Sequence, residues 1–210
     1  MANQHSEHDE HAEHSDLHGN APDKCPVALL LVDVINAMDY PGGDRLLEQA
    51  LPVAQHIARL KATCRRLHVP VVYVNDNFGK WQSDFTHLVE HCLHGGVPGE
   101  PVARILHPEQ DDYFVLKPKH SGFYATTLDI LLTYLQVKTL LLVGLTGDYC
   151  VLLTASDAFL RDFRLFVPAD CVASIDPSEN DHALRYMQRV FRADITPSAQ
   201  LDVPALIADS

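Results

Sequence analysis

The sequence predicts an α/β fold, a three-layer αβα sandwich around a mostly parallel sheet of about six strands. Two observations predict it. Continuous apolar runs of strand length recur along the chain, as expected for strands buried on both faces of a sheet. Segments with apolar residues at helical spacing separate these runs, and this alternation implies parallel strands joined by helical crossovers. Right-handed crossovers place the carboxyl ends of all the strands at one edge, where we expect the active site.

The first half of the chain predicts three strands and two helices. The apolar runs place strands over residues 27–34, 71–75 and 111–118. The helices run from a glycine turn at 42–44 to His68 and over 84–93. A loop over 75–83 precedes the second helix, and the Gly- and Pro-rich segment 94–101 is expected to be a connection.

The second half predicts three more strands and three helices. The strands are expected over 137–144 and 163–168, with a short sixth strand over 193–196. The helices are expected over 128–135 with Thr126 or Thr127 as cap, from near Tyr149 to about Asp162, and from Asp176 to about Arg192. The last helix begins in a segment resembling a capping box, with Pro177 at its first position. Residues 197–210 are mildly apolar and are expected to pack on this domain or on a partner subunit.

The composition fits one folded domain that follows a polar tail. The chain has 210 residues, of which 47% are hydrophobic and 21% charged, enough for one full core. Residues 24–210 are therefore expected to form a single domain. Residues 1–23 hold almost no large apolar side chain and five histidines among acidic residues. We expect them to be a disordered tail, while loose binding of divalent metal ions by its imidazoles remains an alternative.

Charge and cysteine content narrow the function classes. The formal net charge of −12 argues against a nucleic-acid partner or an anionic membrane surface. No apolar run reaches transmembrane length, and the amino terminus lacks the apolar core of a signal peptide. The five cysteines are widely spaced, without a C-x-x-C pair, which favours neither a disulfide framework nor a thiolate metal site. A reducing cytoplasm fits best.

Three reactive side chains follow three of the predicted strands. Asp33 ends the first strand, Lys117 ends the third, and Cys150 follows the fourth in the first turn of a helix. A helix dipole at that position favours a thiolate. The carboxylate is able to take the thiol proton and return it to a leaving amine. The ammonium stabilises the charges, and the sulfur attacks an acyl carbon to form a thioester.

Each of these residues also has an ordinary structural interpretation. Asp33 is able to cap the turn after its strand, Lys117 to lie on the surface beside Pro118, and Cys150 to serve as a small core residue. A carboxylate after five aliphatic residues is costly unless it is paired. Because all three share a strand-end position, the catalytic interpretation is favoured for the set.

These segments resemble the isochorismatase-like cysteine hydrolases, a family that includes nicotinamidases and N-carbamoylsarcosine amidohydrolases. The resemblance extends from Pro26 to Arg192. It implies an Asp-Lys-Cys triad, which Asp33, Lys117 and Cys150 match. It also implies enzymes that act on small-molecule substrates and assemble as homodimers or homotetramers.

The family resemblance further implies a cis peptide bond before the nucleophile. By motif position this bond joins Leu145 and Thr146, and it directs the Thr146 N–H toward the substrate oxygen. With the Cys150 N–H it forms an oxyanion hole, which typically contributes about 3 kcal/mol to the transition state. The family stretch Val-Ala-Thr-(Asp/Asn)-x-Cys reads Leu-Thr-Gly-Asp-Tyr-Cys over residues 145–150 of this chain.

The chain also departs from nicotinamidases at a position that binds metal in those enzymes. Nicotinamidases carry Asp-x-His at the end of the second strand, whereas Phe78 stands at the position of that histidine here. His87 and His91 are spaced i, i+4, which suits Zn²⁺. Without a third ligand near Asp76 they are interpreted as surface histidines, and no metal site is predicted.

The sequence therefore predicts a cofactor-free amidohydrolase that cleaves a small amide or ureido C–N bond, outside peptides, through a Cys150 thioester. Candidate substrate-binding residues lie in the loops near the strand ends: Asn77, Phe78, Trp81, Phe123 and Tyr149. Two alternatives remain open. One is an ester or thioester hydrolase that uses the same triad, and the other is a non-catalytic binding protein with a metal-binding tail.

Overall fold

A computed structural model describes residues 24–77 and 84–209 of the chain. The predicted tail over residues 1–23 lies outside them. The strands are β1 (Val27–Val32), β2 (Val71–Asp76), β3 (Tyr113–Lys117), β4 (Thr139–Leu145), β5 (Arg164–Phe166) and β6 (Val172–Ala173). The α-helices are α1 (Gly43–Arg66), α2 (Phe85–His94), α3 (Glu100–Ile105), α4 (Leu128–Tyr134), α5 (Leu152–Phe159), α6 (Pro177–Val190) and α7 (Val203–Ala208). Short turns are η1 (Gly147–Val151), which is π-helical, and the 3₁₀ turns η2 (Ala169–Cys171) and η3 (Ser198–Gln200).

The described strands form one six-stranded sheet in the order β3-β2-β1-β4-β5, with β6 beside β4. Every pairing between these strands is parallel. The strand order reverses between β1 and β4, which are neighbours although two strands separate them in sequence. Ligands of open parallel sheets bind outside the carboxyl ends of the strands at such a reversal. The topology therefore directs attention to the ends of β1 and β4.

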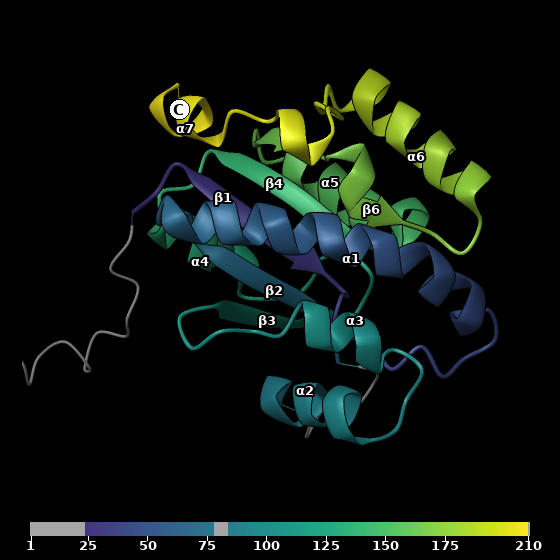
Figure 1. Ribbon diagram of the computed structural model, residues 1–210. Helices are drawn as coiled ribbons and strands as arrows, with labels where there is room; N and C mark the ends of the chain where they lie inside the picture. Colours follow the sequence, from purple (N-terminus) through teal and green to yellow (C-terminus); the bar gives the residue numbers. More distant parts are fainter. Residues whose placement is uncertain (1–23, 78–83, 210) are drawn as a thin grey trace, which may run out of the picture.

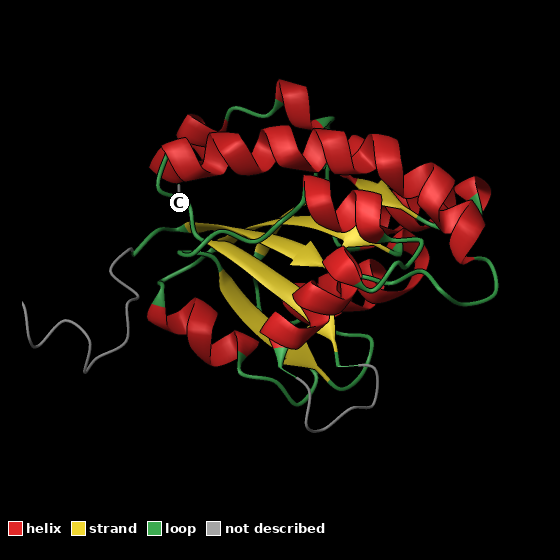
Figure 2. Cartoon of the chain, turned by 60° about the horizontal axis from the view of Figure 1, so that its bottom comes forward, coloured by secondary structure: helices red, strands yellow, loops and turns green. Residues whose placement is uncertain are grey.

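Helices cover both faces of the sheet and make it the middle of three layers (Figure 1). On one face, alternate strand residues such as Leu29, Leu31 and Leu141 pack with α1, α2, α3 and α7. On the other face, their neighbours in sequence, such as Leu30 and Leu142, pack with α4, α5 and α6. Figure 2 shows the sheet between these helical layers. The predicted α/β sandwich is confirmed.

A buried ionic cluster fixes the loop that leads into β3. Lys61 of α1 is 5% exposed, and its Nζ donates to the Tyr73 hydroxyl at 3.0 Å and lies 2.7 Å from Asp112 Oδ2. Arg65, one helical turn later, binds the other oxygen of Asp112 at 2.8 Å. The Asp112 carboxylate is fully buried. Removing either cation would therefore make the burial of its charge more costly. The cluster thus anchors the start of the strand that carries Lys117.

Two predictions about elements were wrong. The sixth strand is β6, which pairs with the end of β4, whereas the segment 193–196 makes a single bridge from Asp194 to Phe166. Helix α3, which starts inside the predicted connection 94–101, was not predicted. Its signal is Pro101 in the first turn after Gly99, a favoured position for proline.

The carboxyl-terminal segment packs on its own domain. Val203 and Leu206 of α7 are buried in the core that α1 covers. Asp170, just after β5, accepts hydrogen bonds from the Ser198 N–H and hydroxyl and lies 2.9 Å from His56 Nδ1 of α1. Of the two placements expected for residues 197–210, the structure gives the intramolecular one. None of the helices in the described ranges is both long and apolar enough to cross a membrane.

Candidate active site

Asp33 follows β1 directly and is held by the neighbouring strand. Its backbone has a φ of +50°, a left-handed conformation that turns the chain out of the sheet and is uncommon for residues other than glycine. The Asp33 N–H donates to the Val74 carbonyl at 3.0 Å, and its Oδ1 accepts from the Asp76 N–H at 2.7 Å. The carboxylate is therefore fixed at the strand ends by β2.

Lys117, the last residue of β3, joins the acidic groups to the thiol. Its side chain is fully buried, and its Nζ lies 2.8 Å from Asp33 Oδ2 and 3.5 Å from Asp76 Oδ2. The same Nζ lies 3.7 Å from Cys150 Sγ. Two carboxylates, one ammonium and one thiol thus form one cluster. They lie at the ends of β2 and β3 and just after β1 and β4. The sequence predicted the positions of three of these residues, and Asp76 is the additional member.

Cys150 lies on the π-helical turn η1, between β4 and α5. Gly144 ends the regular part of β4 with a φ of +120°, and a Cβ there would lie 2.1 Å from the Val32 carbonyl oxygen. Only glycine permits this close approach of β4 to β1. The Leu145–Thr146 peptide bond that follows is cis, at the position that the family resemblance implies. The predicted helix start near Tyr149 is thus a π-helical turn, a form often found at functional sites.

Hydrogen bonds tie this turn to the loop that follows Lys117. The Thr154 side chain, fully buried in α5, donates through its Oγ1 to the Cys150 carbonyl at 2.7 Å. The same Oγ1 accepts from the Gly122 N–H at 3.0 Å. One position earlier, the Ser121 hydroxyl donates to the Asp157 carboxylate of α5. The loop after β3 and the nucleophile helix therefore hold each other in place.

Burial governs the protonation of the cluster. It raises the pKa of Cys150 to about 12, and the nearby charge of Asp33 adds to this, whereas Lys117 only partly offsets it. Burial also raises the pKa of Asp33, although Lys117 opposes the rise. Burial alone would lower the pKa of Lys117, but the attraction of the Asp33 carboxylate outweighs it and the pKa is raised. Desolvation and Asp33 thus oppose the thiolate that the helix dipole was expected to favour.

The predicted pocket residues lie in different environments. Asn77 is buried beside the cluster, and its N–H donates to the Lys117 carbonyl at 3.0 Å. Tyr149 is 50% exposed, and the centroid of its ring lies 4.1 Å from the centroid of the His120 ring. Phe123 packs in the core, and the centroid of its ring lies 6.0 Å from that of Phe163. The remaining two candidates, Phe78 and Trp81, lie outside the described residues.

Tyr40 lies near the cluster, and sequence reasoning missed it. Its side chain is hydrogen-bonded to Asn36, and burial raises its pKa, with the charge of Asp33 adding to the rise. Such interactions place the phenol within electrostatic reach of the cluster, while 38% of the residue remains exposed. The available signal was topological, because the loop that leaves β1 after Asp33 has to pass the same sheet edge.

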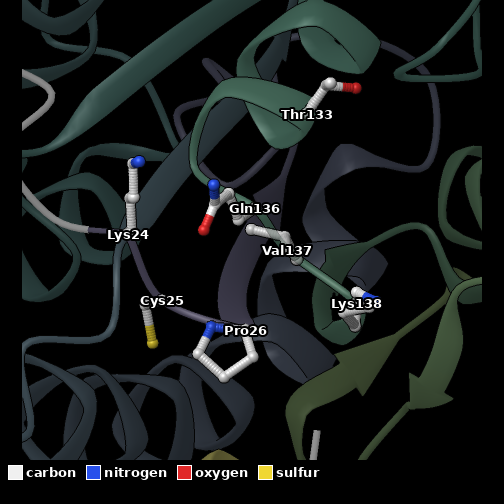
Figure 3. Close-up of a pocket in the computed structure, with 7 residues that line it drawn as sticks. All are labelled: Lys24, Cys25, Pro26, Thr133, Gln136, Val137 and Lys138. Carbon is white, nitrogen blue, oxygen red and sulfur yellow. The ribbon is translucent and has the colours of Figure 1, made fainter.

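A hollow at the opposite edge of the sheet has different chemistry. It has a volume of about 680 Å³ and is lined by Lys24, Cys25, Pro26, Thr133, Gln136, Val137 and Lys138. Figure 3 shows these residues where the chain enters β1 and where α4 leads into β4. These are the amino ends of the strands. We place the candidate site by its convergent reactive groups and not by this hollow.

The predicted surface histidines lie on an exposed face of α2. The His87 side chain is 79% exposed, and its Nδ1 lies 3.0 Å from Asp84 Oδ2; His91 is exposed as well. No group of three or more His, Cys, Asp or Glu side chains is arranged to hold a metal ion in the part of the chain that the structure describes.

Comparison with known proteins gives consistent matches over most of the chain. A family model described as the isochorismatase domain matches residues 27–200. An uncharacterised isochorismatase family protein of Bacillus subtilis, YaaI, is 38% identical over 178 residues, which cover 85% of this chain and 97% of that protein. The ureidoacrylate amidohydrolase RutB of Methylobacterium radiotolerans is 29% identical over 192 residues, which cover 75% of this chain and 70% of that protein. The crystal structure of N-carbamoylsarcosine amidase from Thermoplasma acidophilum has a TM-score of 0.64 and 32% identity, covering 84% of this chain and 98% of that chain.

Proposed function

The chain belongs to the isochorismatase family of hydrolases, and on that premise we propose that it is a cysteine hydrolase of small amides or ureido compounds. One observation carries the proposal. The Lys117 ammonium lies 2.8 Å from Asp33 and 3.7 Å from Cys150 Sγ at the strand-order reversal. The amidase and amidohydrolase among the similar proteins favour C–N bond cleavage. No step of the proposed chemistry requires a cofactor.

The mechanism begins from a neutral thiol. Asp33 accepts a hydrogen bond from Cys150 and takes its proton as Sγ bonds to the substrate carbonyl carbon. The N–H groups of Thr146 and Cys150 bind the resulting oxyanion. Lys117 keeps Asp33 charged before the transfer and stabilises the developing negative charge on sulfur. Because proton transfer accompanies attack, the high pKa of the free thiol is compatible with reaction at neutral pH.

The second half of the cycle restores the resting site. Asp33 gives its proton to the leaving nitrogen, the C–N bond breaks, and ammonia or an amine departs from a Cys150 thioester. Water then attacks the thioester carbonyl while Asp33 takes one of its protons. The C–S bond breaks, the acid is released, and the proton returns to sulfur. The net reaction adds one water molecule across the C–N bond.

The nucleophile is tested with Cys150→Ala and Cys150→Ser. Both variants should keep the circular-dichroism spectrum and melting temperature of the parent chain and lose at least about 10³-fold in kcat on any amide that the parent cleaves. Mass spectrometry of the parent chain quenched in acid should find the acyl group on Cys150. Turnover by the Ala variant within tenfold of the parent would contradict the assignment.

A panel of small amides, ureido acids, esters and thioesters separates the alternatives. Turnover of amides or ureido compounds supports the proposal, whereas turnover of esters alone supports an ester hydrolase on the same residues. The binding-protein alternative predicts neither turnover nor acylation. We also place the enzyme in the cytoplasm, because all five cysteines are free and a reducing compartment preserves a catalytic thiol.

A further inference from the structure

Gly147, the first residue of the turn that carries Cys150, packs directly against a side chain of α6. A Cβ at position 147 would lie 2.2 Å from Asn180 Oδ1 and 2.6 Å from Val172 Cγ1. Real Cβ atoms do not approach other atoms this closely, so a side chain at 147 and the present position of Asn180 exclude each other. The Asn180 side chain thus takes space that a larger residue at 147 would need.

Asn180 is also fixed by hydrogen bonds that end on the nucleophile turn. It is 9% exposed, and its Nδ2 donates to the Val172 carbonyl of β6 at 3.2 Å. Its Oδ1 accepts from the Ser174 hydroxyl at 3.1 Å. Ser174, 1% exposed, in turn accepts from the Asp148 N–H of the turn at 3.1 Å. A buried chain of hydrogen bonds therefore runs from β6 through α6 to the residue two positions before Cys150.

The position of this chain matters because η1 carries several of the groups that the proposed reaction uses. Cys150 supplies both the sulfur and an N–H for the oxyanion, and Thr146 stands immediately before the turn. Hydrogen bonds in a buried polar network reinforce one another and favour a single geometry. Displacement of catalytic groups by about 1 Å is able to cost roughly 10²-fold in rate.

We propose that Asn180 is a positioning residue, which together with Ser174 holds the π-helical turn so that the backbone N–H groups and the sulfur of Cys150 meet the same substrate carbonyl. The inference rests on the proposed hydrolase function. It requires Gly147 and Asn180 to act as a pair, since each defines the space that is left for the other.

A double-mutant cycle tests this pairing. The variants are Gly147→Ala, Asn180→Ala and the double variant, with Gln188→Ala on the exposed face of α6 as matched control. Asn180→Ala should lower kcat by about 10- to 100-fold with KM changed less than about threefold. Gly147→Ala should lower kcat by a factor at least ten times smaller in the Asn180→Ala background than in the parent chain. The contact with Asn180 Oδ1 is then gone, whereas the contact with Val172 Cγ1 is the same in both backgrounds. The control should match the parent.

Two outcomes would overturn the inference. Additive losses in the cycle would mean that the two residues do not act together. A loss of kcat that follows a loss of melting temperature, and that vanishes when the assay is cooled, would mean that Asn180 only stabilises α6. Ser174→Ala provides a second variant should Gly147→Ala fail to fold, and it should show the same split between kcat and KM.

Failure of the hydrolase proposal itself is recognised separately. The rate of iodoacetamide alkylation of Cys150 reports the setting of the sulfur without any substrate. If no substrate is hydrolysed, a coupled change of this rate across the cycle still supports the positioning role, and an additive change contradicts it. If substrate is hydrolysed while the cycle is additive, the positioning role alone is lost.

Discussion

The protonation of Cys150 is the property that most separates this site from that of an ordinary reactive cysteine. Its pKa of about 12 reflects burial first and the Asp33 carboxylate second. Thiolate reactivity therefore has to arise when substrate is bound and Asp33 takes the proton. The other described cysteines are buried, so that alkylation by a small reagent reports mainly on Cys150.

Asp33→Asn should separate thiol acidity from catalysis. Removing the carboxylate removes a charge that raises the pKa of Cys150 and leaves Lys117, which lowers it. The pKa of the thiol should fall, and alkylation by iodoacetamide at pH 8 should become at least tenfold faster. Hydrolysis should nevertheless fall at least about 10²-fold, because the proton acceptor is gone.

The pH profile of alkylation gives the matching measurement. In the parent chain the rate should still rise between pH 8 and pH 10, since a thiol with a pKa of about 12 remains mostly protonated there. In Asp33→Asn the rate should level off at lower pH. A parent profile that levels off below pH 9 would contradict the neutral resting thiol.

At the scale of elements, α5 and the loop after β3 are joined by Thr154. Thr154→Val keeps the shape of the side chain but loses the hydrogen bonds with the Cys150 carbonyl and the Gly122 N–H. Leaving these buried groups unpaired should cost about 1–3 kcal/mol of unfolding free energy and lower kcat about tenfold. Chemical denaturation and steady-state kinetics measure the two effects.

Thr154→Ser is the control for this change. It keeps the hydroxyl and loses one methyl group, which should cost about 1 kcal/mol in stability and leave kcat within about twofold of the parent. Equal losses of kcat in the Val and Ser variants would show that the methyl packing, and not the hydrogen bonds, matters for the turn.

Elements with a strong periodic pattern were predictable from the sequence, and short ones were not. Helix α1 follows the helical spacing of its buried residues, such as Leu46, Ala50 and Ile57, and ends within two residues of the prediction. Strand β6 has two residues and takes its place only by pairing with the end of β4. No local pattern encodes such a pairing. The predicted strand over 193–196 failed for the same reason. Its sequence favours a strand, but only Asp194 pairs with a residue of the sheet, Phe166.

The candidate site was predictable as far as strand ends define it. Asp33, Lys117 and Cys150 were found because parallel strands bring their carboxyl ends together. Tyr40, Asn180 and Thr154 were not found, because loop paths and the packing of α5 and α6 bring them to the site. The sign of the pKa shift at Cys150 was also out of reach, since it depends on how deeply the cluster is buried.

At the scale of the whole molecule, the layer of α4, α5 and α6 exposes large apolar side chains. Ile130 of α4 and Leu160 at the end of α5 are each 72% exposed, and Tyr186 of α6 is 44% exposed. Ion pairing of Asp129 with Arg161 at 3.6 Å brings the first two regions together. Exposed apolar patches often mark protein–protein interaction sites. We propose that this layer contacts a second copy of the chain in a homodimer or homotetramer.

Leu160→Glu tests the assembly. A charge at the centre of an apolar interface is costly to bury unpaired, so the variant should elute as a monomer in size-exclusion chromatography with light scattering, while the parent elutes as a dimer or tetramer. Gln110→Glu adds the same charge at an exposed site before β3 and should keep the parent mass. A monomeric parent at micromolar concentration would contradict the proposed oligomer.

The strand order also explains why position 117 carries a lysine. Strand β2 separates β3 from β1, so the backbones that carry the ammonium and the Asp33 carboxylate stand two strand spacings apart, about 10 Å. A straight four-carbon stem spans most of that gap and still delivers a cation small enough to fit between a carboxylate and a sulfur atom. Shorter bases would not span the gap, and arginine would bring a broad planar head in place of the compact ammonium. Length and compactness, rather than basicity alone, set the identity of this residue.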